Sequence, residues 1–204
     1  MKKIFSFACS CTGTITVGLR VIGVLAVLSG ASACHQMAAS DYVGKAAEDY
    51  KTGRYDAAVT HCTKAIELGT LGKNDLAIAY GNRGMAYRAK EQYDRAIEDY
   101  TKAIELKPKD AWIYNNRGVA YKGKKEYDRG IRDFDKAIEL DPKNVYLYYN
   151  KACVYSLMNN AQDSCRWLGT AVEKGFTDWN AIKADPDFNN IRNSACYKGL
   201  MAGK

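Results

Sequence analysis

The side chains of this chain that could do chemistry are chiefly its seven cysteines and its two histidines, His35 and His61. A zinc site draws its ligands from closely spaced Cys and His residues, such as a CxxC pair. The sequence has no CxxC pair, no HExxH motif, no glycine-rich phosphate loop and no GxSxG motif. We therefore expect neither a metal site, nor a cofactor, nor an enzyme.

Residues 1–33 have the features of an export signal. Basic residues and a short apolar run at 21–28 come first, and the small residues Ala31 and Ala33 then precede Cys34. The apolar run is much shorter than the roughly 20 residues that a membrane-spanning helix needs. We therefore expect an exported protein whose mature chain begins at about Cys34, with residues 34–39 as a linker.

Cys34 is compatible with two outcomes of export. Residues 28–34 (LSGASAC) resemble the lipobox of bacterial lipoproteins, in which the cysteine after the cleavage point carries a diacylglycerol. This resemblance implies lipidation at Cys34 and membrane anchoring. Lipoboxes usually carry a bulky aliphatic residue where this chain has Ala31, so the alternative is cleavage after Ala33 and release of a soluble protein. Either outcome places the protein in the periplasm or on an envelope membrane of a bacterium.

An oxidising compartment would allow disulfides among the cysteines that remain after export. Spacing alone does not tell which of them pair. The four candidates are Cys62, Cys153, Cys165 and Cys196.

The formal net charge of the full sequence is +7, and part of that excess lies in the signal. The rest is spread along the chain without a run of basic residues, whereas nucleic-acid binding usually shows a basic cluster. We therefore expect no nucleic-acid partner.

A period of 34 residues organises the rest of the chain. Residues 77–110 align without gaps on residues 111–144, a divergent copy follows at 145–178, and a first copy precedes at about 40–73. The matched pairs are Tyr80 and Tyr114, Gly84 and Gly118, Tyr87 and Tyr121, Tyr93 and Tyr127, Ala96 and Gly130, Tyr100 and Phe134, Ala103 and Ala137, and Pro108 and Pro142. This pattern of small residues, aromatic residues and a final proline resembles the tetratricopeptide repeat.

The resemblance implies an all-α fold in which about four helix-turn-helix units stack into an α-solenoid. In the second unit we expect helices at about 77–90 and 93–106, because apolar or small residues recur there every three or four positions. We expect Gly84 to face Ala96 where these helices cross. Residues 179–204 are predicted to form a C-terminal capping helix and tail, with an apolar stripe of Phe188, Ile191, Ala195 and Leu200.

In tetratricopeptide repeats the first helix of each unit lines a concave groove. Transferred to this chain, the resemblance implies groove positions at Ile78, Gly81, Asn82, Met85, Arg88, Trp112, Asn115, Asn116, Val119, Lys122, Tyr146, Tyr149, Asn150, Cys153 and Ser156, with Asp41, Gly44 and Glu48 in the first unit. Amides can bond a peptide backbone and aromatic rings can anchor its side chains. The alternative is that the asparagines stabilise the array and the aromatic residues pack between units.

These observations predict a protein-interaction adaptor that binds a peptide or helix of a protein partner in the groove. The alternative is a structural envelope protein that associates with itself into a homo-oligomer.

Overall fold

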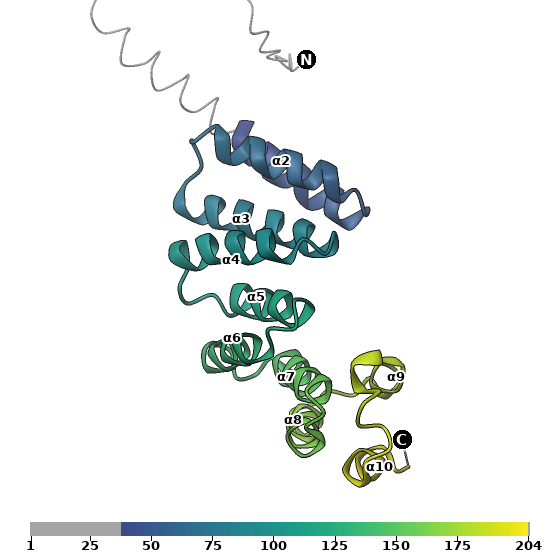
Figure 1. Ribbon diagram of the computed structural model, residues 1–204. Coiled ribbons are helices and arrows are strands. Elements are labelled where there is room, and N and C mark those ends of the chain that lie inside the picture. Colours follow the sequence, from purple (N-terminus) through teal and green to yellow (C-terminus); the bar gives the residue numbers. More distant parts are fainter. Residues whose placement is uncertain (1–37, 204) are drawn as a thin grey trace, which may run out of the picture.

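The computed structural model describes residues 38–203 as helices joined by turns, with no strand in that range (Figure 1). A helix over residues 38–51 is followed by α2 (Tyr55–Glu67), α3 (Lys73–Ala89), α4 (Tyr93–Leu106), α5 (Ala111–Gly123), α6 (Tyr127–Leu140), α7 (Val145–Leu157), α8 (Ala161–Glu173), α9 (Trp179–Ala184), the 3-10 helix η1 (Pro186–Phe188) and α10 (Ala195–Met201). No helix in the described part of the chain combines the length and apolar character needed to cross a membrane.

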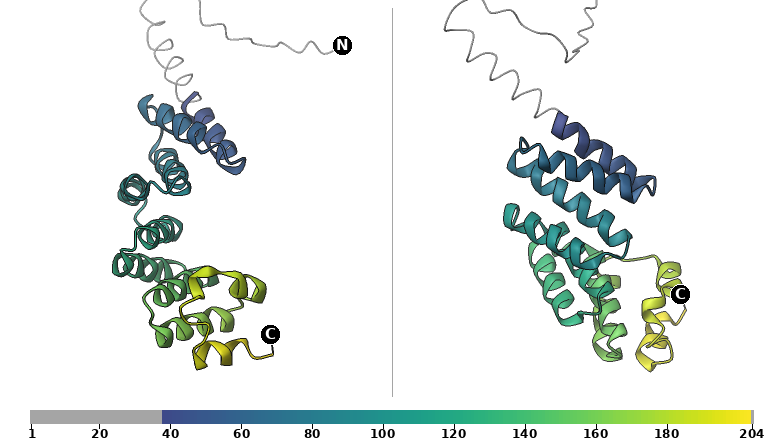
Figure 2. Two further views of the ribbon diagram at one scale, coloured as in Figure 1. Left: turned by 45° about the vertical axis from the view of Figure 1, so that its right-hand side comes forward. Right: turned by 45° about the horizontal axis from the view of Figure 1, so that its top comes forward.

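The helices stack in the order of the sequence. Within units, α3 packs on α4, α5 on α6 and α7 on α8, and between units α2 packs on α3, α4 on α5 and α6 on α7. The views in Figure 2 show that the array bends as it proceeds from the first helices to α8. This arrangement confirms the predicted all-α solenoid, in which each unit covers a face that its neighbour would otherwise leave exposed.

Gly118 shows why small residues recur where two helices of a unit cross. A Cβ atom on Gly118 would lie 2.9 Å from the Phe134 ring, and a Cβ atom on Gly130 would lie 3.1 Å from the Gly118 carbonyl oxygen. The equivalent Gly84 would place a Cβ atom 2.9 Å from the Tyr100 ring. These glycines therefore admit the aromatic ring of the second helix as well as the close approach of the helix backbones.

The helix α3 begins at Lys73, earlier than the residue 77 at which the second unit was expected to start. The extra residues between the first two units thus partly extend α3 instead of lengthening the loop. Gly72 precedes the helix in an extended conformation, and Asp75 places a negative charge in the first turn, where it interacts favourably with the helix dipole.

The C-terminal segment differs from the predicted capping helix. It forms α9, η1 and α10 instead of one helix. Asp185 caps η1 by accepting a hydrogen bond from the Asp187 N–H at 2.9 Å, and Pro186 lies in the first turn of η1, where its missing N–H costs no helical bond. Ala195, expected on the apolar stripe, is exposed, whereas Tyr197 is buried. Phe188 and Ile191 are buried as expected and share a core with Leu168 of α8.

A disulfide between Cys165 and Cys196 joins α8 to α10. The other two candidate cysteines, Cys62 and Cys153, are buried free thiols. Burial raises the pKa of Cys62 to about 12, so this thiol stays protonated at neutral pH. The disulfide therefore fixes the C-terminal segment to the last unit of the array.

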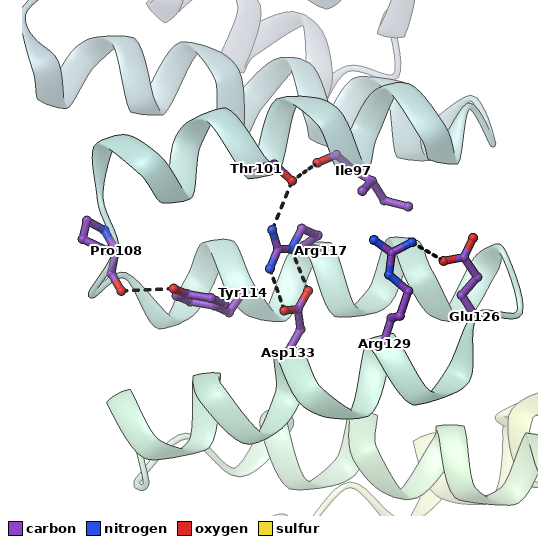
Figure 3. A network of polar contacts seen from close by, with 8 residues as sticks. All are labelled: Ile97, Thr101, Pro108, Tyr114, Arg117, Glu126, Arg129 and Asp133. Atoms are coloured by element: carbon purple, nitrogen blue, oxygen red, sulfur yellow. Dashed lines mark hydrogen bonds and ion pairs between the residues drawn. The ribbon is translucent and has the colours of Figure 1, made fainter.

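A repeated polar contact links neighbouring units, and Figure 3 shows the instance around Arg117. Arg117 of α5 donates two hydrogen bonds to Asp133 of α6, at 2.7 and 2.8 Å, and a third to the Thr101 hydroxyl of α4 at 3.1 Å. The same bonds recur one unit earlier among Arg83, Asp99 and Thr63. Each arginine therefore joins both helices of its own unit to the second helix of the unit before.

The fourth unit replaces this contact with a different set of side chains. Lys151 stands at the arginine position, pairs with Asp135 and lies over the Trp167 ring, with its Nζ 3.8 Å from the ring centroid. Asp135 occupies the repeat position of Thr101, and Trp167 occupies that of Asp133. In the fourth unit the carboxylate, Asp135, therefore comes from the preceding unit and not from the unit's own second helix, and the cation, Lys151, is still paired.

Candidate protein-binding face

Three large apolar side chains recur at one repeat position and are open to solvent. Ile78, Trp112 and Tyr146 are 43%, 45% and 63% exposed, and they follow one another at intervals of 34 residues on α3, α5 and α7. Met158, at the end of α7, is the other large apolar residue exposed in the described part of the chain. The first helices of the units therefore present a row of apolar side chains, which we call the apolar row.

A hollow of about 230 Å³ lies between α3 and α5 at this row. Its lining includes Ile78, Asn82 and Trp112, with Lys107 and Asp110 at the turn before α5. Trp112 lies close to the backbone of α3, since a Cβ atom on Gly81 would be 3.0 Å from its ring. The predicted groove residues Ile78, Asn82 and Trp112 therefore lie together, with one amide at an otherwise largely apolar depression.

The other groove asparagines make contacts within the array. Asn116 is 7% exposed and donates a hydrogen bond to the Trp112 carbonyl at 2.8 Å. Asn150 donates to the Asn115 side chain at 2.8 Å and so connects α7 to α5. These bonds correspond to the array-stabilising alternative, whereas Asn82 lines the hollow.

The C-terminal segment covers the groove-lining face at the fourth unit. The Tyr149 ring stacks on Phe176 with centroids 4.7 Å apart, and its hydroxyl donates to Asp185 at 2.6 Å. Lys122 of the third unit forms an ion pair with Asp187. Two of the predicted groove residues, Lys122 and Tyr149, are thus engaged by the protein's own chain.

These contacts gather ionisable groups at the end of the groove. Potential metal-ligand atoms of Cys153, Asp185 and Asp187 lie within 4.8 Å of one another, a group that the sequence did not predict. Burial raises the pKa of Cys153, and burial together with the hydrogen bond to Asp185 raises that of Tyr149. Burial opposes the charged form of Lys122, yet its neighbours, the Asp187 carboxylate among them, raise its pKa. The neutral thiol of Cys153 and the paired ammonium of Lys122 therefore both contact the C-terminal segment and help to hold it in place.

Arg88 lies at the repeat position of Lys122 but has no comparable ion pair. No carboxylate of residues 38–203 lies within 4.0 Å of its guanidinium. Its Nε and the hydroxyl of Tyr100 are both buried without a well-aligned hydrogen bond in that range, although the two side chains are neighbours and Arg88 opposes the burial that raises the pKa of Tyr100. Arg88 is therefore a partly buried cation of α3 whose charge is not matched by a carboxylate of the described residues.

The Tyr146 ring lies edge-on to the Phe176 ring, with ring centroids 5.6 Å apart, but Tyr146 stays mostly exposed. In the first unit Asp41, Gly44 and Glu48 are exposed. Cys34, the predicted lipidation site, lies outside the described residues.

Sequence reasoning did not identify the contribution of Phe176, Asp185 and Asp187 to this face. Their contacts join residues 27 to 65 positions apart and depend on how the segment after α8 turns back. A local signal existed, because Phe176 stands where the earlier units have Pro108 and Pro142. That substitution indicates that the chain departs from the repeat at this point.

Comparison with known proteins gives an independent assignment of the repeats. A family model described as "TPR repeat" matches residues 84–125, and two described as "Tetratricopeptide repeat" match residues 111–144 and 134–166. The human (Homo sapiens) mitochondrial import receptor subunit TOM70 is 39% identical over 61 residues. That match covers 29% of this chain and 10% of the receptor, so this chain spans about a tenth of that relative's length.

Solved structures show the same fold. MamA from Desulfovibrio magneticus RS-1 superposes with a TM-score of 0.60 at 21% identity, covering 65% of this chain and 73% of that one. The first TPR of Spaghetti (RPAP3), solved with the HSP90 peptide SRMEEVD, superposes with a TM-score of 0.55 at 22% identity, covering 60% of this chain and 97% of that one. Residues 84–166 are therefore tetratricopeptide repeats, and the described chain has the fold of a tetratricopeptide-repeat solenoid.

Proposed function

We propose that this protein is a non-enzymatic interaction adaptor that binds a segment of another protein along the open part of its groove-lining face. The observation that carries the proposal is the apolar row of Ile78, Trp112 and Tyr146, left exposed at one repeat position beside a hollow. Large aromatic side chains at such a surface commonly supply most of the binding free energy of an interface. The RPAP3 structure, which holds a peptide on the same fold, supports this use of the scaffold.

The binding surface that we propose is centred on α3 and α5. At α7 the C-terminal segment already contacts Tyr149, and Lys122 is paired with Asp187. Between α3 and α5 the hollow is open, and Asn82 offers an amide that can donate to or accept from a peptide backbone. A partner segment would therefore place an apolar side chain in this hollow and bond its backbone to Asn82.

We further propose that the protein acts in the bacterial cell envelope, either anchored through a lipid on Cys34 or released into the periplasm. The signal features of residues 1–33 motivate this location. The disulfide between Cys165 and Cys196 supports it, because disulfides persist in oxidising compartments and are rare in the cytosol.

Site-specific photocrosslinking tests the binding surface. A photoactivatable phenylalanine analogue at position 78 should capture a partner protein in intact cells, because Ile78 is 43% exposed at the hollow. The matched control carries the same analogue at position 158, where Met158 is 39% exposed but lies outside the apolar row. Capture of the same proteins in equal amounts from both positions would contradict the proposal.

The same experiment separates the adaptor from a self-associating protein. If the apolar row packs against a second copy, the crosslinked product from position 78 has twice the mass of the protein, and light scattering of the purified protein shows a mass that rises with concentration. We expect instead a product that contains a different protein.

A further inference from the structure

The C-terminal segment shows which chemistry the groove-lining face accepts. Residues 176–188 place Phe176 against Tyr146 and Tyr149, and present Asp185 to the Tyr149 hydroxyl. Asp187 of the same segment pairs with Lys122, which belongs to the preceding unit. The face thus binds an acidic segment that carries aromatic side chains, through the rings of Tyr146 and Tyr149 and through the Lys122 ammonium.

Part of this binding surface is repeated one unit earlier. Counterparts 34 residues upstream are Trp112 for Tyr146, Asn115 for Tyr149, Val119 for Cys153 and Arg88 for Lys122. The aromatic residue and the cation are therefore retained, while an amide replaces the Tyr149 ring. In the described part of the chain the C-terminal segment reaches only the later copy, through α7 and Lys122.

Two observations indicate that no segment of residues 38–203 occupies the earlier copy. Trp112 is 45% exposed, although it lies beside the hollow and has no aromatic ring stacked on it among residues 38–203. Arg88 has no carboxylate partner in that range, and the described side chain next to its guanidinium is the neutral Tyr100 hydroxyl. A partly buried guanidinium without an ion-pair partner is unfavourable, and a carboxylate of a partner segment would pair with it.

We infer that the surface between α3 and α5 binds an acidic partner segment that carries an aromatic side chain, with the aromatic ring on Trp112 and a carboxylate on Arg88. This inference rests on the proposed function and adds the chemical class of the partner segment. Charge complementarity selects this class, because Arg88 stands at the repeat position of Lys122 and, among residues 38–203, has no carboxylate partner such as the one that Asp187 provides to Lys122.

A peptide derived from the protein itself provides the probe. A fluorescent peptide of residues 176–190 (FTDWNAIKADPDFNN) is titrated against the full-length protein, next to the same peptide with Asp185→Asn and Asp187→Asn. The intramolecular segment is covalently fixed near its own site and outcompetes a dissolved peptide there, so the probe reports on the open copy. We expect the acidic peptide to bind at least about tenfold more tightly than the neutral one, consistent with loss of a charged hydrogen-bonded contact.

Variants of the protein assign that selectivity to one residue. Arg88→Gln should remove the preference for the acidic peptide, and Arg88→Lys, which reproduces the Lys122 position, should restore most of it. Trp112→Ala should weaken both peptides alike. Arg95→Gln is the control, because Arg95 lies on α4 and bonds to the Gln92 side chain instead of facing the groove. Circular dichroism of each variant checks that the helices are retained.

The inference is overturned if neither peptide binds at about 1 mM, a concentration that corresponds to a very weak interaction. It is also overturned if both peptides bind equally, or if Arg88→Gln leaves the preference intact. If the peptides show no acid preference while position 78 still captures a partner, this inference fails and the proposed function stands. Failure of both experiments overturns the proposed function as well.

Discussion

Replacing Asp133 with alanine is expected to lower the free energy of unfolding by about 3 kcal/mol. The Arg117 and Asp133 side chains are only 17% and 9% exposed, and they share two hydrogen bonds. Asp133→Ala leaves the guanidinium largely desolvated without its carboxylate, and the loss of a partner from a buried pair costs far more than the loss of a surface pair. Because Arg117 also bonds Thr101 of the preceding unit, the variant weakens the interface between units as well.

Urea unfolding followed by circular dichroism measures this change. Glu139→Ala is the matched control, because Glu139 pairs with Lys136 on the exposed side of the same helix and should change stability by less than about 0.5 kcal/mol. The double variant Arg117→Met with Asp133→Leu should recover much of the loss, since it removes both charges. Equal stabilities of the Asp133 and Glu139 variants would show that the buried pair does not stabilise the fold.

Removing the disulfide is expected to cost about 3 to 4 kcal/mol in the chain-entropy description of cross-links. Cys165 and Cys196 are separated by 31 residues, so their bond restricts a long loop of the unfolded chain. It also keeps α10 against α8, with Tyr197 in the same core as Phe188 and Leu168. The double variant Cys165→Ser with Cys196→Ser should therefore unfold at a lower urea concentration than the oxidised protein.

Reduction provides the internal control for that prediction. A reductant should bring the oxidised protein to the stability of the double variant and should leave the double variant unchanged, because Cys62 and Cys153 are free thiols. Mass spectrometry after alkylation of the unreduced, denatured protein should find those two cysteines modified and the other two protected. Modification of all four cysteines would contradict the pairing.

Most of the fold could be predicted from the 34-residue repeat period. The gapless match of residues 77–110 on 111–144 predicts both helices of each unit and their order, because each unit forms largely from contacts within itself and with its neighbour. The same alignment pairs Arg83 with Arg117 and Asp99 with Asp133, but acidic residues on helices are usually solvated, so the sequence gives no sign that these two are buried. Their burial follows from the packing of three helices, which the sequence of one helix does not show.

The candidate site was predicted only in part. Repeat positions identified Trp112 and Asn82, because the residues that line the groove recur with the period. They could not separate Asn116, which bonds the Trp112 carbonyl, from Asn82, since both amides stand at the same repeat position. The contacts of Asp185 and Asp187 lay outside the period, because these residues belong to the segment after α8, where the chain forms the short helix η1 against α7 instead of another repeat unit.

The affinity of a captured partner for Trp112→Ala, compared with Met158→Ala, tests the central claim most directly. Both side chains are large, apolar and exposed to a similar extent, but only Trp112 belongs to the apolar row. We expect Trp112→Ala to weaken binding by about 30-fold or more, the effect of losing an aromatic residue worth about 2 kcal/mol at the centre of an interface. Met158→Ala should change the affinity by less than about twofold, which is the size expected of a residue outside the interface. Unchanged affinity for the Trp112 variant would show that the partner does not bind this face.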